Sequence, residues 1–284
     1  VRCRLRPLAQ RPAAVLADRP AVALALLAIA LHLYASGGYG YFRDELYFIV
    51  CGEHPDWGYV DQPPLIPLIA AFMHRWFAPS LVMLRLPSAL AHAATIALAG
   101  ETARLLGGRR WAQAVAGLAV LCGAIFLATG TILSTDALQP LAWLLCGYAL
   151  IRILRDHDER WWPVLGLVAG VALWSKYMIG FWLLALAIGL VLTQPRRVLL
   201  RPGPYIAAAI AGLIILPNVL WQAAHGWPFL EIGRAGATGK NIALPPLAFL
   251  RAELRELGGA TAPLWLTGLA AFAVWRRFAA LRGF

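Results

Sequence analysis

Long apolar stretches separated by short polar segments make up most of the chain. Each approaches the roughly 20 residues that a helix needs to cross the hydrocarbon core of a membrane. The stretches are apolar on nearly all sides, as in helices that face lipid. We therefore expect an all-α polytopic membrane protein with about eight transmembrane helices and interfacial helices in its first outward loop. The expected helices are 20–36, 81–103, 111–131, 137–154, 161–175, 177–194, 204–222 and 260–275.

Composition supports a membrane protein and explains the charge. Hydrophobic residues make up 61% of the chain and charged residues 14%, whereas soluble proteins average about 25% charged residues. The net charge of +11 comes from arginines in alternate connections between the predicted helices. Under the positive-inside rule such connections face the cytoplasm, so the charge reflects topology and predicts no nucleic-acid partner. Both termini are then cytoplasmic, in a multi-pass protein of the plasma (inner) membrane. The loops 37–80, 132–136 and 223–259 face outward.

The first outward loop holds two aromatic and acidic stretches, Tyr41–Tyr47 and Trp57–Leu65. Apolar residues recur at helical spacing from Arg43 to about Cys51, which predicts a helix lying on the membrane surface. The chain begins with Val1 and ends on a basic segment after the last predicted span. We therefore expect residues 1–284 to be one transmembrane region that is a fragment or the product of a truncated open reading frame.

Four charged residues at the membrane edges are candidates for chemistry. Asp44 and Asp136 either cap helices or act on a substrate, and Glu45 by itself is typical of a solvated surface charge. Lys176 either extends its ammonium group to the interface or binds a phosphate. Ionisable groups at a membrane are costly unless paired, which favours a functional role for these residues.

Other site types find little support in the sequence. There is no pair of His or Cys residues with metal-ligand spacing and no glycine-rich nucleotide loop. His225 alone is weak evidence for a metal. A site for a soluble nucleotide-sugar is therefore not expected.

Several motifs together resemble the family 39 glycosyltransferases of the membrane-embedded C-type superfamily, whose relatives include protein O-mannosyltransferases and the bacterial lipid A aminoarabinose transferase. The resemblance covers most of the chain, although family members usually run longer. The motifs are Asp44-Glu45, Pro63-Pro64-Leu65, Arg85–Ser88, Arg109-Arg110, Ser134–Ala137 and Ser175-Lys176.

This resemblance implies transfer of a sugar from a polyprenyl-phosphate donor to a lipid, glycan or protein acceptor at the outer face. Asp44 would be the base that activates the acceptor, with inversion, and Glu45 the second choice. Asp136 would orient the acceptor or hold a divalent cation, the one cofactor considered. Residues expected to bind the substrate are Arg43, Tyr59, Lys176, His225 and Arg234.

Two other classes stay open at this point. A transporter would place polar groups at the membrane midplane on broken helices, and Pro217-Asn218 is expected to interrupt the helix at 204–222. A non-catalytic scaffold or an inactive fragment of an enzyme is the second alternative.

Overall fold

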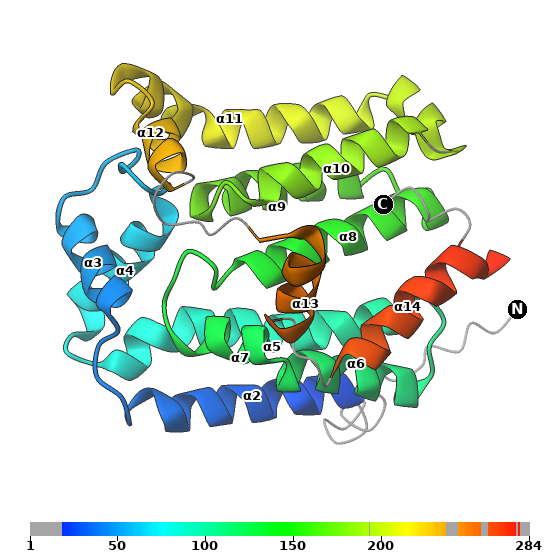
Figure 1. Ribbon diagram of the computed structural model, residues 1–284, viewed down its shortest axis with the longest axis horizontal. Helices are drawn as coiled ribbons and strands as arrows, with labels where there is room; N and C mark the ends of the chain where they lie inside the picture. The colour runs from blue at the N-terminus through cyan, green and yellow to red at the C-terminus, as the bar shows by residue number, and fades with distance from the viewer. Residues whose placement is uncertain (1–18, 193, 237–243, 257–260, 277, 279–284) are drawn as a thin grey trace, which may run out of the picture.

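The computed structural model describes residues 19–192, 194–236, 244–256, 261–276 and 278, and within them every regular element is a helix. Figure 1 shows the long helices lying side by side, with α3, α4 and α12 together at one end, here called the α3–α4 end. The helices are α2 (Pro20–Ser36), α3 (Arg43–Glu53), α4 (Leu65–Phe77), α5 (Leu81–Leu105), α6 (Arg110–Cys122), α7 (Ala124–Thr131), α8 (Gln139–Asp156), α9 (Trp161–Ser175), α10 (Ile179–Leu192), the 3-10 helix η1 (Gln194–Leu200), α11 (Gly203–Ala224), α12 (Pro228–Ala235), α13 (Pro246–Glu256) and α14 (Ala262–Val274).

The helices predicted from the apolar stretches are present, with ends within two residues of those expected. The helix predicted in the first loop is α3, and α4 is a second helix in that loop; the position of α3 on a membrane surface stays a prediction. Among the described residues, α5 and α11 are long and apolar enough to cross a membrane alone. The bent pair α6 and α7 makes a third if it is counted as one span. A total of about eight spans stays a prediction.

The expectation of a continuous helix over 111–131 is wrong. α6 ends at Cys122, α7 begins at Ala124, and their axes differ by 61°. Gly123 between them has an extended backbone, with φ −71° and ψ 122°. A residue that leaves the helical region ends the hydrogen-bond ladder, and glycine does so with little steric cost. The bend directs the end of α7 toward the segment that leads to Asp136.

The expected interruption at Pro217-Asn218 is also wrong, because α11 runs through Pro217 without a break. A proline removes one hydrogen-bond donor from a helix. In membrane helices neighbouring groups commonly satisfy the carbonyl that is freed. The broken helix that would have favoured a transporter is therefore absent at this position.

A buried pair of histidines connects α2, α5 and α6 next to the bend between α6 and α7. His32 Nε2 on α2 lies 2.7 Å from His92 Nδ1 on α5, and His92 Nε2 lies 3.2 Å from Val120 O on α6. A carbonyl oxygen only accepts, so His92 Nε2 carries the proton, and in neutral rings His92 Nδ1 accepts from His32 Nε2. A Cβ on Gly130 would lie 2.8 Å from His32 Nε2, so α7 packs directly on the pair.

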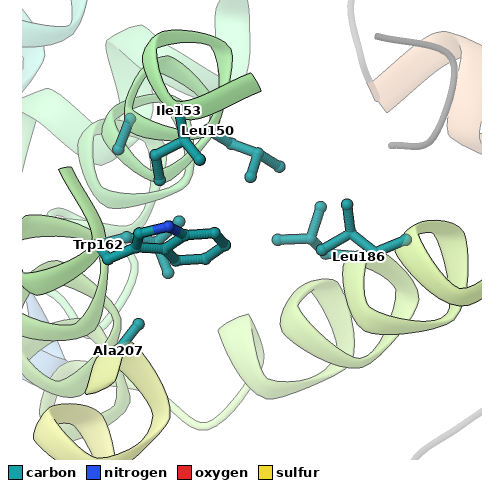
Figure 2. Packing of buried hydrophobic residues seen from close by; sticks show 8 residues of the cluster. Leu150, Ile153, Trp162, Leu186 and Ala207 are labelled. Carbon is teal, nitrogen blue, oxygen red and sulfur yellow. The ribbon is translucent and has the colours of Figure 1, made fainter. Parts of the chain in front are cut away.

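The largest part of the core lies between α8, α9, α10 and α11. Figure 2 shows Trp162 surrounded by Leu150, Leu186 and Ala207. α9 and α11 approach closely because Gly166 has no side chain, since a Cβ there would lie 2.5 Å from Ala207 O. A second buried cluster packs beside the short turn between α9 and α10, where Lys176 lies, and contains Ala142, Cys146, Ala169, Ala172 and Ile179.

The arginine-rich connections lie at the end of the bundle opposite to the α3–α4 end (Figure 1). Arg155 donates to Leu105 O, and Arg201 donates to Glu159 Oε1. Three connections, after α5, α8 and α10, therefore meet there. The predicted cytoplasmic location of both termini concerns residues 1–18 and 279–284, which lie outside the described residues.

Candidate functional site

A pocket of about 400 Å³ lies at the α3–α4 end, at the turn between α9 and α10. Polar groups line one part of it, and apolar side chains of α10 and α12 line the rest. The lining residues are Asp61, Gln62, Pro63, Thr135, Ser175, Lys176, Tyr177, Met178, Gly180, Phe181, Leu184 and Phe229. Four segments distant in sequence therefore form one site.

Lys176 and Asp136 form an ion pair at this pocket. Lys176 Nζ donates to Asp136 Oδ1 and Oδ2, both at 2.7 Å, and the two side chains are 34% and 49% exposed. Ser175 Oγ donates to Thr135 O at 2.9 Å and joins the two segments. The capping interpretation of Asp136 is wrong, because α8 begins after Leu138 without a side-chain cap. Lys176 is bound to a carboxylate and does not simply extend into solvent.

The loop after α3 brings a second carboxylate to the pocket. Asp61 accepts a hydrogen bond from the Tyr47 hydroxyl at 2.7 Å. Burial, and then the hydrogen bond to Asp61, raise the pKa of the Tyr47 hydroxyl above its usual range. Tyr47 therefore stays protonated and holds Asp61 at the pocket wall.

Two side-chain amides of α11 anchor the loop after α3 by donating hydrogen bonds to backbone carbonyls of the loop. Asn218 Nδ2 donates to Trp57 O at 2.9 Å, and Gln222 Nε2 donates to Tyr59 O at 3.3 Å. Tyr177 next to Lys176 donates its hydroxyl proton to Asn218 Oδ1 at 2.7 Å. The loop and the α9–α10 turn are thus held by the same two amide side chains.

Tyr59, expected to bind substrate, instead holds the loop together. Its hydroxyl lies 2.8 Å from Cys51 O and 3.1 Å from His54 O. Both carbonyls accept, so the single hydroxyl proton is shared between them. Tyr59 is absent from the pocket lining, and its contacts are with the end of α3.

Asp44 lies in the first turn of α3, with its side chain 39% exposed. The capping interpretation of Asp44 is wrong, since the N-cap is Phe42. Arg43 Nε donates to Asp44 Oδ1 at 3.0 Å, and the Arg43 side chain is 87% exposed. Asp44 precedes Tyr47 by three residues, so both lie on one face of α3. Neither Asp44 nor Arg43 lines the pocket itself.

Glu45 is fully buried, so the interpretation as a solvated surface charge is wrong. Its two oxygens accept from Arg85 Nε at 2.8 Å and from Arg85 Nη2 at 2.7 Å. Arg85 is also buried and donates to the carbonyls of Ser36, Tyr39 and Gly40. A paired, planar geometry of this kind can balance the cost of burying two charges.

Glu45 also connects the first loop to the segment of the second acid. Its Oε1 accepts from Leu133 N at 3.2 Å, and its Oε2 accepts from Phe42 N at 2.9 Å. Leu133 is fully buried and lies three residues before Asp136. Glu45 therefore positions both Asp44 and the segment that leads to Asp136, and its own lone pairs are occupied.

The remaining expected binding residues lie away from the pocket lining. The His225 ring stacks on Trp221, and His225 Nδ1 lies 2.8 Å from Trp221 O. Arg234 is exposed in the last turn of α12. The structure thus brings together Asp136 and Lys176 from the predicted set, whereas Asp44 lies on α3 outside the pocket lining.

A divalent cation at Asp136 does not fit this arrangement. Both carboxylate oxygens of Asp136 accept from the Lys176 ammonium group. Among the described residues there is no group of three or more His, Cys, Asp or Glu side chains able to hold a metal ion. Hard cations need several oxygen ligands.

Sequence reasoning missed several residues that build the site. Asp61 and Gln62 stand directly before the Pro-Pro turn, and the burial of that turn indicates that its neighbours are held in place. Arg85, a charge within the first turns of an apolar helix, predicts a buried acidic partner. Asn218 and Gln222, four residues apart on one apolar helix, indicate a polar stripe that faces protein.

Comparisons with known proteins identify the family to which the chain belongs. Residues 61–221, more than half of the chain, match the family described as dolichyl-phosphate-mannose-protein mannosyltransferase. The chain belongs to this family, which confirms the resemblance seen in its motifs.

The chain is also similar to the lipid A galacturonosyltransferase RgtD of Rhizobium johnstonii. The two are 28% identical over 186 residues, which cover 65% of this chain and 39% of that protein. The chain therefore spans about two fifths of the length of this relative. No solved structure matches the chain.

Proposed function

We propose that the chain carries the donor site of an integral membrane glycosyltransferase that uses a polyprenyl-phosphate sugar. The sugar moves, with inversion, to a hydroxyl or phosphate acceptor at the outer (periplasmic) face. The observation that carries this proposal is the Lys176–Asp136 ion pair, whose lysine lines a pocket together with polar residues and large apolar side chains.

The apolar wall suits a lipid-linked donor. Met178, Phe181 and Leu184 are 48%, 69% and 58% exposed, although they line the same pocket as Lys176. Large apolar side chains exposed next to charged ones indicate a surface that another apolar molecule covers. A prenyl chain along α10 would leave its phosphate beside the Lys176 ammonium group.

Lys176 would stabilise the charge that develops on the departing phosphate. An ammonium group has three donors, and two of them are directed at Asp136. The third can meet a phosphate oxygen while the ion pair persists. Fixed donors aimed at developing negative charge are effective where water is excluded.

Asp44 would act as the general base. It takes the acceptor proton while the acceptor oxygen forms a bond to the anomeric carbon. The bond from that carbon to the phosphate oxygen breaks, and its electron pair leaves with the phosphate. Attack from the face opposite the phosphate inverts the anomeric centre. Asp44 is preferred over Glu45, because every Glu45 oxygen already accepts hydrogen bonds within the protein.

The test compares Asp44→Asn with Glu53→Gln, an exposed acid at the other end of the same helix. Purified protein receives undecaprenyl phosphate charged with mannose or galacturonic acid, with a peptide or a lipid A precursor as acceptor. Asp44→Asn should lower the transfer rate by about 100-fold or more and preserve donor binding. Glu53→Gln should transfer at the wild-type rate. Near wild-type transfer by Asp44→Asn would refute its role as the base.

The outward orientation is tested separately by thiol labelling in intact cells. Glu53→Cys is placed in a Cys51→Ala background, which removes the buried cysteine of the same loop. An impermeant maleimide should label it without lysis, because the arginine-rich connections lie at the opposite end of the bundle. Labelling only after lysis would reverse the assigned face.

Transport and a purely structural role predict different results. A transporter would move a sugar-lipid across the membrane without breaking the sugar–phosphate bond. An inactive fragment would bind the donor and release no polyprenyl phosphate. The polar groups of the described pocket lie at one end of the bundle, which favours chemistry at a membrane surface.

A further inference from the structure

Gln62 is a buried amide in the pocket with an unused donor. The residue is 3% exposed and lines the pocket between Asp61 and Pro63. Its backbone carbonyl accepts from Tyr59 N at 3.0 Å. Within the described residues its side-chain Nε2 has no hydrogen-bond partner. The Cys51 sulfur lies within reach of a weak hydrogen bond to this side chain, which would use only one of the two Nε2 protons.

A donor in this state is unusual, since nearly all buried polar groups in proteins have a partner. The neighbouring residues hold it in place. Pro63 and Pro64 are fully buried, and their rings restrict the backbone directly after Gln62. The contacts of these neighbours therefore hold Gln62 at the pocket.

The two charged groups that line the pocket each have a partner already. Lys176 is balanced by Asp136, and Asp61 accepts from Tyr47. The Gln62 amide adds a neutral donor that a ligand can use without breaking either interaction. An oxygen acceptor on the ligand would satisfy it.

We propose that the Gln62 amide is a substrate-binding group that donates its Nε2 hydrogen to an oxygen of the sugar-phosphate head in this pocket. This inference rests on the proposed donor site. The oxygen belongs either to the phosphate or to the sugar, because both accept hydrogen bonds. Gln62 would then orient the donor against Lys176, with no part in proton transfer.

The test replaces the amide by an apolar side chain of similar length, Gln62→Met. The control is Gln113→Met, which makes the same change at a buried glutamine on α6. Removing an unsatisfied buried donor should leave the thermal midpoint of the ligand-free protein in detergent unchanged or higher. Affinity for undecaprenyl phosphate charged with galacturonic acid or mannose should fall about 10-fold to 100-fold. Gln113→Met should bind the donor like the wild type.

Two probes distinguish the acceptor oxygen. If Gln62 meets the phosphate, Gln62→Met weakens binding of uncharged undecaprenyl phosphate as well, and Gln62→Lys restores it. If Gln62 meets the sugar, only the charged donor binds more weakly. Equal binding of both probes by Gln62→Met, with a lowered thermal midpoint, would overturn the inference and leave the amide a structural role. Failure of the wild type to bind either probe would overturn the proposed donor site itself.

Discussion

Removing the Arg85 guanidinium should be among the most damaging single changes in the described chain. Arg85 and its partner Glu45 are 1% and 0% exposed. Arg85→Met removes five hydrogen bonds, leaves the buried Glu45 carboxylate without its positive partner and takes a donor from three backbone carbonyls. Breaking a buried ion pair in this way costs about 3–5 kcal/mol. Arg85→Lys should restore little, since an ammonium group has three donors and lacks the planar fork.

A second substitution at the partner residue, Glu45, gives a sharper test than Arg85→Met alone. With methionine at position 85, the charge on Glu45 is buried without compensation. Adding Glu45→Gln removes that charge and keeps an oxygen to accept from Leu133 N. The double variant should therefore be more stable than Arg85→Met alone, although each single change is harmful.

The assay is equilibrium unfolding in detergent, followed by the fluorescence of the 12 tryptophans. The control is Arg104→Met, which breaks an ion pair whose side chains are 48% and 24% exposed. That pair should contribute less than about 1 kcal/mol. A free energy of unfolding of Arg85→Met within about 1 kcal/mol of the wild type would refute this expectation. A double variant less stable than Arg85→Met alone would refute it as well.

Three further expectations concern the pocket and its loop. Lys176→Ala should weaken binding of charged undecaprenyl phosphate by about 10-fold to 100-fold, with partial rescue by Lys176→Arg; unchanged affinity would remove its phosphate role. Gly58→Ala should lower the transfer rate, because a Cβ there would lie 2.6 Å from Trp221 Cε3. Gly40→Ala is the control, since a Cβ at that position has no atom within 4 Å. Equal transfer rates for the two variants would refute the close packing of the loop against Trp221. The pKa of Tyr47 is raised in the folded state. Its contribution to stability is therefore complete at pH values below the pKa of an unfolded tyrosine, about 10. That contribution is lost as the pH rises through the pKa of the folded state. The difference in thermal midpoint between wild type and Tyr47→Phe should therefore be constant at neutral pH and decline in strong alkali, and a decline already below pH ~9 would contradict this assignment.

The positions of the helices could be predicted from the sequence because long apolar stretches are a local signal. The bend at Gly123 was not predicted, since a glycine within an apolar stretch is common in membrane helices. The opposite error occurred at Pro217, where α11 continues. Whether a glycine or a proline breaks a helix depends on neighbouring helices, and no local pattern reports them.

The residues of the candidate site also divide into those that a local sequence pattern indicates and those that only the fold reveals. Asp136 and Lys176 could be identified because each interrupts an apolar stretch at a predicted outward turn. Glu45 was misjudged, since its partner Arg85 lies 40 residues away and only the fold brings them together. Gln62 was not singled out, because an amide next to a Pro-Pro turn is unremarkable until its burial and its unused donor are known.

The way in which α11 holds the loop before α4 has a consequence for how such an enzyme can diverge. Asn218 and Gln222 bind the carbonyl oxygens of Trp57 and Tyr59, groups that every amino acid possesses. Apart from Gly58 and Tyr59, whose side chains the packing itself restricts, side chains in this loop can therefore be exchanged while its attachment to α11 is kept. Selection for a new sugar or acceptor can act on the pocket wall around Asp61 one residue at a time, without first rebuilding the scaffold that holds it.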